Sequence, residues 1–438
     1  MRINDPYEYW QINKATRKAG DEAEKRLASV FARIADIREH NQLRVLQAMQ
    51  EARVSDSGFG GTTGYGYDDM GRDQLEDVYA RVFGAEAAYV RHSIATGTQA
   101  LAACLYGILR PGDEMLSITG RPYDTLSRTI GLKALKKELS DPGSLKDFGI
   151  TYRQVDLQPD GMPNWDEVAH SVRPETKLVF IQRSRGYMGR PAYRIEEIAR
   201  LIELVRVQSS SVVIMVDNCY GEFVEKLEPC MVGADICAGS LIKNPGGGIA
   251  PGGGYIVGRA DLVERAANRL TAPGLGSDVG PSLGMNRLLM QGFFLAPHVV
   301  AEALKGMAFA AELLAAHGVI TSPAADTRRS DIVQTLKFPT AEAMIKFCQN
   351  VQRAAPVDSF VTPIPAPMPG YESDVIMAAG AFIQGGSLEL SADGPIRPPY
   401  MAFMQGGIVY EQVKLAVLMA VQDMAATEDI SEPTMKGL

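Results

Sequence analysis

The order of strand-like and helix-like runs is the feature that most constrains how this sequence can fold. Short apolar runs typical of strands recur from residue 87 to residue 257, and helical patterns lie between several of them. The expected strands are Ala87–Val90, Glu114–Thr119, Ile150–Val155, Leu178–Gln182, Val212–Asp217, Asp235–Ala238 and Gly252–Val257. Strands that alternate with helices predict an α/β fold, with a mostly parallel seven-stranded sheet and helices on both faces.

The last of these strands differs from the others in its expected direction. Gly252–Val257 is joined to the preceding strand by a turn that is too short for a crossover helix. Because parallel neighbours need a long crossover connection, we expect this strand to run antiparallel.

Helical and strand patterns also divide the chain into regions. A helical region at Asp21–Arg53 precedes the sheet, and another at Leu288–His317 follows it. Later strand-like runs predict a smaller C-terminal α+β domain, at Ile332–Phe338, Phe360–Pro363, Val375–Ala379 and Ser387–Ser391. We therefore predict an N-terminal helical segment at 1–55, a large domain at 56–295 and a small domain at 296–438.

Composition excludes several classes of protein. The 438 residues are 46% apolar and 22% charged, which is ordinary for a globular chain, and the net charge of −8 disfavours nucleic-acid binding. The most basic stretch, at 133–137, reads as a solvated helix face. No apolar run approaches membrane-spanning length and the N-terminus shows no signal peptide, so we expect no membrane association.

The cysteines and histidines give no sign of a metal centre or a disulfide framework. The five cysteines form no C-x-x-C pair and the five histidines are dispersed, so we expect no metal ligands. An odd number of cysteines, mostly in apolar contexts, is typical of reduced thiols in a cytoplasmic protein.

One acid and one lysine stand out at the ends of apolar runs. Asp217 closes the run Val212–Asp217, and Lys243 lies in the turn Ser-Leu-Ile-Lys-Asn-Pro-Gly-Gly-Gly. Taken singly, Asp217 reads equally as a turn residue or helix cap, and Lys243 as a solvated lysine. Taken together, a lysine for a Schiff base and an acid for a pyridinium nitrogen are what pyridoxal phosphate chemistry requires.

Four further residues follow predicted strands and suit a phosphorylated aromatic cofactor. Gly97 and Thr98 lie at the start of a predicted helix, whose free N–H groups attract an anion, although a Thr-Gly-Thr word is also an ordinary cap. Tyr123 could stack on a flat ring or be a half-buried loop tyrosine. Ser240, three residues before Lys243, can donate a hydrogen bond to a phosphate.

Several arginines are candidates for binding a substrate carboxylate. Arg397 lies between prolines in DGPIRPPY, which stiffen the backbone, and arginine binds carboxylates in a bidentate manner. The competing candidates are Arg72, Arg183, Arg185 and Arg190.

The ordered set of motifs resembles the methionine gamma-lyase and cystathionine beta-lyase aluminium-resistance family, within the fold-type I pyridoxal-phosphate enzymes of cysteine and methionine metabolism. The matching words include TTGYGYDDMGRDQLE, VDNCYGEFVE, AGSLIKNPGGG and LSADGPIRPPY, and the matches run from about residue 54 to residue 415. The chain departs from the family pattern at Thr96–Gln99, where the family has S-G-T-H, and at Met188–Gly189, where it has serine and tryptophan.

The resemblance implies roles for these residues. Lys243 would form the Schiff base, and Asp217 would pair with the pyridine nitrogen. Tyr123 would stack on the cofactor ring. Gly97, Thr98 and Ser240 would hold the phosphate.

It also implies an assembly and a substrate site. The protein would be a homodimer or homotetramer with active sites at the subunit interface, and Tyr65 would reach the phosphate of a neighbouring subunit. Arg397 would bind the substrate carboxylate, with Arg185 as an alternative, and Tyr65 or Tyr67 would assist the leaving group.

The implied activity is elimination of a β- or γ-substituent from an L-amino acid. A thiolate is the expected leaving group, and a γ-halide that leaves an alkyne is an alternative. Transamination or racemisation on the same cofactor stays open, as does a non-catalytic, cofactor-binding stress protein.

Overall fold

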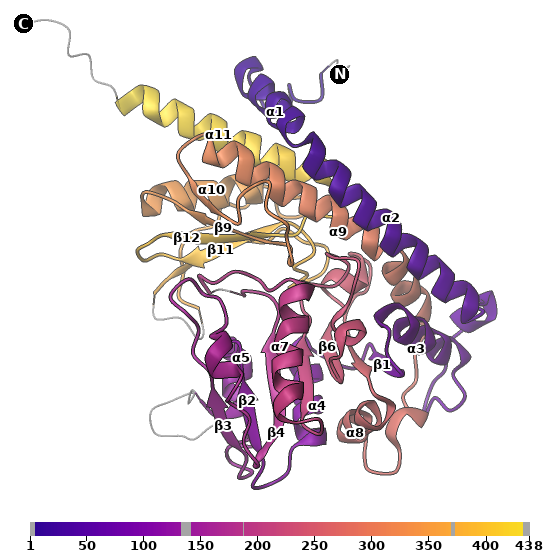
Figure 1. Ribbon diagram of the computed structural model, residues 1–438. Coiled ribbons are helices and arrows are strands. Elements are labelled where there is room, and N and C mark those ends of the chain that lie inside the picture. The colour runs from indigo at the N-terminus through magenta and orange to yellow at the C-terminus, as the bar shows by residue number, and fades with distance from the viewer. Residues whose placement is uncertain (1–4, 133–141, 187, 369–372, 432–438) are drawn as a thin grey trace, which may run out of the picture. The chain divides into compact units, whose positions relative to one another are not determined.

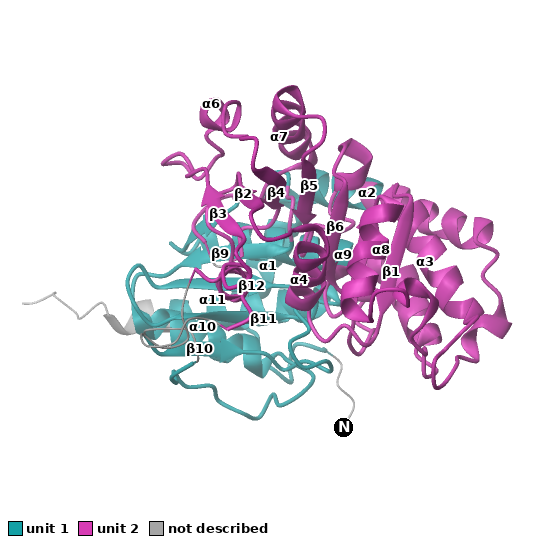
Figure 2. Cartoon of the chain, turned by 90° about the horizontal axis from the view of Figure 1, so that it is seen from below, with its two compact units in different colours: residues 1–36, 299–328, 332–438 teal, residues 37–298, 329–331 magenta. Residues whose placement is uncertain are grey.

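The computed structural model describes residues 5–132, 142–186, 188–368 and 373–431 (Figure 1). The basic stretch at 133–137 lies outside these residues. The chain forms two compact units, shown in different colours in Figure 2. Unit 1 contains residues 1–36, 299–328 and 332–438, and unit 2 contains residues 37–298 and 329–331.

Unit 2 is built on a seven-stranded sheet. Its strands are β1 (Ala87–Arg91), β2 (Glu114–Ser117), β3 (Thr151–Gln154), β4 (Thr176–Gln182), β5 (Val213–Asp217), β6 (Ile236–Ser240) and β7 (Gly254–Gly258). They lie in the order β1-β7-β6-β5-β4-β2-β3. All neighbours are parallel except those of β7, which pairs antiparallel with both β1 and β6. The predicted sheet and the antiparallel direction of its last strand are confirmed.

Helices cover both faces of this sheet, as the alternation predicts. Those of unit 2 are most of α2 (Ala28–Glu51), α3 (Met70–Phe83), α4 (Gly97–Ile108), α5 (Asp124–Ile130), α6 (Trp165–Val168), α7 (Ile195–Gln208), α8 (Ala260–Leu270) and the first part of α9 (Asn286–Ala315). Phe180, Met215 and Ala238 of the sheet pack in one buried cluster with α4, α5 and α8. Figure 2 shows α7 on the opposite side of the sheet from α4.

An aromatic cluster fixes α3 and α9 against the end of the sheet. Tyr255 of β7 alternates with Ile256, so its ring points to the face opposite the α4 cluster. There it packs near Phe83 and Tyr79 of α3, with ring centroids 5.2 and 5.8 Å away. Phe293 of α9 stacks on Tyr79 at 3.8 Å.

Unit 1 contains a separate five-stranded antiparallel sheet. Its strands, in the order β10-β11-β12-β9-β8, are β8 (Ile320–Ser322), β9 (Val333–Lys337), β10 (Val375–Ala378), β11 (Ser391–Pro395) and β12 (Met401–Gln405). Its helices are α1 (Lys14–Arg26), the start of α2 (Ala28–Glu51), the second part of α9, α10 (Ala341–Arg353) and α11 (Tyr410–Ser431). This sheet with its helices confirms the predicted α+β region.

Two of the expected strands in unit 1 are wrong. Residues 360–363 are irregular, and Phe360 and Val361 are exposed rather than packed on a sheet. Pro363 cannot donate a ladder hydrogen bond, so this apolar stretch does not pair. The strand expected at Ser387–Ser391 begins only at Ser391, because the preceding residues form a buried turn in which Leu388 accepts a hydrogen bond from Gly407.

The helical regions differ from the expected ones only in detail. Asp21–Arg53 belongs to two helices, because α1 ends at Arg26 and α2 begins at Ala28. α9 runs without interruption from Asn286 to Ala315, across the predicted boundary at 295–296. The predicted domain boundaries stay a prediction.

α9 is the one helix among the described residues that has the length and hydropathy of a membrane span. The sequence pattern did not single it out as such. Its most apolar window is 72% buried inside the protein, as in the core helix of a soluble protein.

Replacing Phe293 should strongly destabilise unit 2. Phe293 is fully buried, and Phe293→Ala leaves a cavity beside Tyr79 that should lower the free energy of unfolding by about 3–5 kcal/mol. Phe294→Ala is the matched control, because Phe294 is 37% exposed and should cost about 1 kcal/mol or less. Urea unfolding measures both, and equal losses for the two variants would contradict the proposed packing.

Candidate active site

Parallel strands place their carboxyl ends along one edge of a sheet, and a cavity of about 270 Å³ lies at this edge in unit 2. It is lined by Thr96, Gly97, Thr98, Tyr123, Thr125, Gln182, Ser184, Gly186, Asp217, Cys219, Tyr220, Ser240, Ile242 and Lys243. The structure thus brings together the predicted cofactor residues of the α4, α5, β5 and β6 regions.

One end of the cavity is formed by the first turn of α4. Thr96 is the N-cap, and its hydroxyl accepts a hydrogen bond from the Gln99 N–H at 3.0 Å. Gly97 and Thr98 follow it, facing the buried Ser240. A Cβ on Gly97 would lie 3.2 Å from Cβ of Ser240, so a side chain there would crowd this end of the cavity. The N–H groups at the start of α4, the hydroxyls of Thr98 and Ser240, and the missing side chain at Gly97 together form a site for an anion, called the anion cradle below.

Tyr123 is held at the side of this cradle. Its hydroxyl lies 2.9 Å from Oγ1 of Thr98, and its backbone N–H donates to Gln182 at 2.9 Å. Burial raises the pKa of the Tyr123 hydroxyl, so the phenol stays neutral. A neutral, fixed aromatic ring is available to a flat ligand.

Asp217 ends β5 beside Gln182 of β4 and Ala238 of β6. It is buried, and its Oδ1 accepts a hydrogen bond from the Cys219 N–H at 3.1 Å. Burial raises the pKa of Asp217 above its ordinary value, although Lys243 acts in the opposite direction. A carboxyl group in this setting favours a nearby cation.

Lys243 follows β6 and extends its amine over the ring of Tyr220, with Nζ 4.0 Å from the ring centroid. Burial opposes the charged ammonium, but electrostatic attraction to the neighbouring Cys219, Tyr220 and Asp217 outweighs burial and raises the pKa of Lys243 above its ordinary value. Tyr220 has a positive φ of 69°, which is costly for a bulky residue and is characteristic of functional sites.

Glycines directly after a ligand-binding lysine can leave room for a bulky ligand. Two of the glycines after Lys243 are needed for another purpose. A Cβ on Gly246 would instead lie 1.7 Å from the Leu241 carbonyl oxygen, and one on Gly247 would lie 2.1 Å from that of Gly292. Close backbone packing therefore requires these glycines.

The residues in the cavity fit pyridoxal phosphate. The α4 cradle suits the phosphate and Tyr123 suits the aromatic ring. Asp217 suits a protonated ring nitrogen, and Lys243 supplies an amine for the aldehyde. All four chemical requirements are met within a single cavity.

A buried ionic network shapes the loop at 218–228, which follows Asp217 and carries Tyr220. Arg183, directly after β4, is fully buried and donates to Asn218 and Glu225 at 2.8 Å each. Glu228 lies 3.5 Å from Arg183 and accepts hydrogen bonds from the Asn218 side chain and the Phe223 N–H. One guanidinium thus holds both ends of the loop.

Glu222 is a buried carboxyl group on the same loop. It accepts a hydrogen bond from the Tyr255 hydroxyl at 2.7 Å, and its backbone carbonyl accepts one from the Asn244 side chain, next to Lys243. Burial raises the pKa of Glu222 to about 8. The group is therefore mostly protonated near neutral pH.

Tyr65 and Tyr67 lie away from this cavity, on the glycine-rich loop before α3. They are 72% and 57% exposed, with ring centroids 5.6 Å apart. Neither lines the cavity of its own chain. Exposed, stacked tyrosines are available to another molecule.

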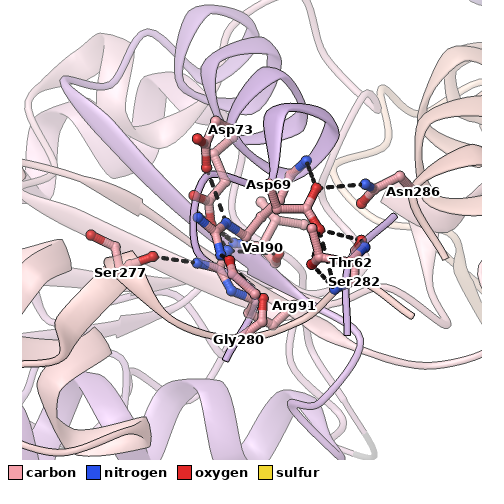
Figure 3. A network of polar contacts seen from close by, with 12 residues as sticks. Thr62, Asp69, Asp73, Val90, Arg91, Ser277, Gly280, Ser282 and Asn286 are labelled. Atoms are coloured by element: carbon pink, nitrogen blue, oxygen red, sulfur yellow. Dashed lines mark hydrogen bonds and ion pairs between the residues drawn. The ribbon is translucent and has the colours of Figure 1, made fainter. Parts of the chain in front are cut away.

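A polar network holds the backbone of this loop (Figure 3). Asp69 accepts hydrogen bonds from Thr62, Ser282 and Asn286. Burial opposes the charge on Asp69, but these hydrogen bonds outweigh it and hold the pKa of Asp69 well below its ordinary value. Arg72 donates to the Gly66 carbonyl at 2.6 Å and to that of Gly280 at 3.2 Å. Hydrogen bonds therefore hold the backbone that carries Tyr65 and Tyr67, which gives the two rings a rigid support.

Most of the other arginines considered for binding a substrate carboxylate instead bind groups of the protein itself. Arg72 and Arg183 bind the loops described above, and Arg190 donates to the carbonyls of Gln182 and Ser184. Arg185 is buried, with Nε 3.8 Å from Oδ2 of Asp331. Arg397 lies exposed in the turn between β11 and β12 of unit 1. The carboxylate-binding residue stays a prediction, with Arg397 and Arg185 as its candidates.

Several residues that line the cavity were not predicted as site residues from the sequence. Gln182 ends β4 as Asp217 ends β5, and Ser184 lies two residues later, so the strand-end rule points to both. Cys219 and Tyr220 lie two and three residues after Asp217, and this short separation was a usable signal. Ile242 directly precedes Lys243, and this closeness along the chain is a signal of the same kind.

Known proteins match this chain along nearly its whole length. The family model described as methionine gamma-lyase matches residues 16–425. The chain belongs to the methionine gamma-lyase family. YnbB, an uncharacterised protein of Bacillus subtilis, is 52% identical over 408 residues, which cover 93% of this chain and 96% of YnbB.

Solved structures of the family have the same fold. A Listeria monocytogenes protein, proposed to be a cystathionine beta-lyase involved in aluminium resistance, is 51% identical with a TM-score of 0.90, covering 93% of this chain and all of its own. A carbon–sulfur lyase involved in aluminium resistance from Clostridium novyi is 46% identical with a TM-score of 0.90, covering 95% and 98% of the two chains.

A more distant structure shares the fold alone. YhfS, a pyridoxal-5'-phosphate-dependent protein of Escherichia coli, is 19% identical with a TM-score of 0.60 and covers 90% of this chain and 97% of its own. The fold is therefore fold type I. Family membership and the relatives support a pyridoxal-phosphate-dependent carbon–sulfur lyase.

Glu222 should make stability depend on pH. Its folded-state pKa of about 8 lies above the ordinary 4.5, so its contribution to stability is fully present below about pH 4.5 and is lost as the pH rises to about 8. Glu222→Gln removes this titration. Urea unfolding at about pH 5 and about pH 8.5 should show the wild type losing stability relative to this variant. Glu203→Gln, at an exposed position on α7, is the control, and a pH-independent difference for Glu222→Gln would contradict the assignment.

Proposed function

We propose that this protein is a lyase that uses pyridoxal phosphate to eliminate a β- or γ-substituent from an L-amino acid. The observation that carries the proposal is the single cavity shared by the anion cradle, Tyr123, Asp217 and Lys243. Family membership supports a carbon–sulfur bond as the one that breaks, with a thiolate as leaving group. A cytoplasmic location is part of the same proposal, and the five cysteines are all unbonded.

The cofactor, when bound, supplies an aldehyde for a Schiff base and an electron sink for the charge that develops at Cα. Asp217 would hold the ring nitrogen in its protonated form. Gly97, Thr98 and Ser240 would bind the phosphate. These contacts orient the ring against Tyr123.

Lys243 is the proposed base. With its amine free, the Nζ of Lys243 would remove the proton from the substrate Cα. Asp217, paired with the ring nitrogen, would then attract the ammonium form of Lys243 less, which would favour the neutral amine. For γ-elimination the same amine would also move a proton at Cβ.

A substrate panel tests the activity. The holoenzyme should release a thiol and a 2-oxo acid from S-substituted cysteine or homocysteine derivatives, with a γ-halide amino acid as a further arm. Lys243→Ala should reduce product release by about 10²–10⁴-fold or more, because it removes the general base. Lys177→Ala, an exposed lysine on β4, is the matched control.

Three other outcomes would contradict this function. An aminated cofactor without loss of the substituent would indicate an aminotransferase. An inverted substrate would indicate a racemase. Purified protein without visible cofactor absorption, or with absorption and no turnover on any substrate, would support a non-catalytic protein.

We further propose that the protein is a homodimer or homotetramer in which Tyr65 serves the phosphate site of a neighbouring subunit. Its exposure and its rigid support favour this use. Mixed oligomers test this proposal. If each active site takes Lys243 from one chain and Tyr65 from its neighbour, a pair made of one Lys243→Ala chain and one Tyr65→Ala chain contains one intact site. Co-expression of the two variants should restore about a quarter of the activity, since half of randomly paired dimers carry one intact site.

Tyr9→Ala is the control for this experiment, because Tyr9 is 73% exposed and belongs to unit 1. It should retain activity alone. If Tyr65→Ala is inactive and the mixture stays inactive, Tyr65 acts within its own chain and the interface proposal is wrong.

A further inference from the structure

Two cysteines outside the active-site cavity lie close together. The Sγ atoms of Cys230 and Cys237 are 3.3 Å apart. Cys230 is half-buried in the short 3-10 helix η2 (Pro229–Val232), and Cys237 is buried on β6. Both are free thiols.

The two positions differ in how the backbone is paired. Cys237 pairs with Val216 of β5 and Val257 of β7, so the sheet fixes its backbone on both sides. Cys230 lies on one short turn that ends at Gly233, which has a left-handed φ of 105°. A disulfide needs the sulfurs about 2.05 Å apart, so the two Sγ atoms would have to approach by about 1.2 Å, through rotation of the cysteine side chains together with a shift of η2.

We propose that Cys230 and Cys237 form a reversible intramolecular disulfide, with a low-molecular-weight disulfide as the oxidant. The half-buried Cys230, as its thiolate, attacks one sulfur of the small disulfide and releases one small thiolate. Cys237 then attacks Cys230 in this mixed disulfide and releases the second. The two protons from the cysteine thiols go to the two thiolates released, so two cysteine thiols are oxidised and two small thiols are formed.

The disulfide would act on the loop after β5. Glu228 is the N-cap of η2, and its fully buried carboxylate binds Arg183 and the Asn218 side chain. A shift of η2 towards β6 would therefore pull on the network that holds the loop after Asp217, which carries Tyr220. Oxidation of a thiol pair outside the cavity thus reaches the cavity wall.

Peptide mapping tests the disulfide directly, whether or not the proposed function is correct. Trypsin releases both cysteines in one peptide, Leu227–Lys243, because no lysine or arginine lies between them. After the folded holoenzyme is incubated with oxidised glutathione, most of this peptide should be lighter by two hydrogens and should not react with iodoacetamide. Dithiothreitol should restore both thiols.

Variants make the test specific. Cys237→Ser should stop at a glutathione adduct on Cys230, and Cys230→Ser should give neither the adduct on residue 230 nor the intramolecular bond. Peptides with the buried Cys104 and Cys348 should stay reactive after denaturation and serve as internal controls. Alkylation of both cysteines in the wild-type peptide after oxidation, or identical products from wild type and Cys237→Ser, would overturn the proposal.

A spectroscopic readout tests the coupling to the cavity. Unlike peptide mapping, this readout requires that the proposed cofactor is bound. Oxidation should change the visible absorption or circular dichroism of the bound cofactor in the wild type, reversibly with dithiothreitol, and not in Cys230→Ser. A disulfide without any spectral change would overturn the coupling through Glu228.

Discussion

The parallel pairing of β4, β5 and β6 is the constraint on which the site depends. Their register sets Gln182 beside Asp217, and Asp217 beside Ala238, so side chains that are far apart in sequence share one sheet edge. Lys243 reaches this edge because β6 ends at Ser240, and β7 then returns antiparallel. A register shift of one residue would turn Asp217 away from the cavity, since side chains alternate between faces.

Buried charge is organised around this edge in two layers. Asp217 and Lys243 face the cavity, whereas Arg183 lies behind them with Glu225 and Glu228 and is excluded from water. Removing one member of such a buried group leaves an uncompensated charge, which is strongly destabilising. The loop between Asp217 and Glu228 therefore keeps its structure only as a whole. The strained φ of Tyr220 is maintained by that loop, and the ring it positions contacts the amine of Lys243.

The sequence was informative where a local pattern determines the outcome. The run Val212–Asp217 predicted both a buried strand and an acid at its carboxyl end, and the seven strands of unit 2 follow the same logic. Patterns failed where apolar residues are not in a sheet, as at Phe360, or where a buried turn resembles a strand, as at Ser387–Leu390. The use of Gly246 and Gly247 could not be predicted, because the atoms that require them, in Leu241 and Gly292, are set by tertiary packing. The role of Tyr65 came from the family resemblance alone, whereas that of Arg397 came from its position between prolines and from the resemblance, and both remain proposals.

Lys243 is the residue proposed to bind the cofactor covalently. The most direct measurement is borohydride reduction of the purified holoprotein, followed by tryptic digestion and mass spectrometry. Because a modified lysine resists trypsin, we expect a pyridoxyl group at Lys243 within the peptide Leu227–Arg259. A pyridoxyl group on another lysine, or a coloured protein that yields no modified lysine, would contradict it.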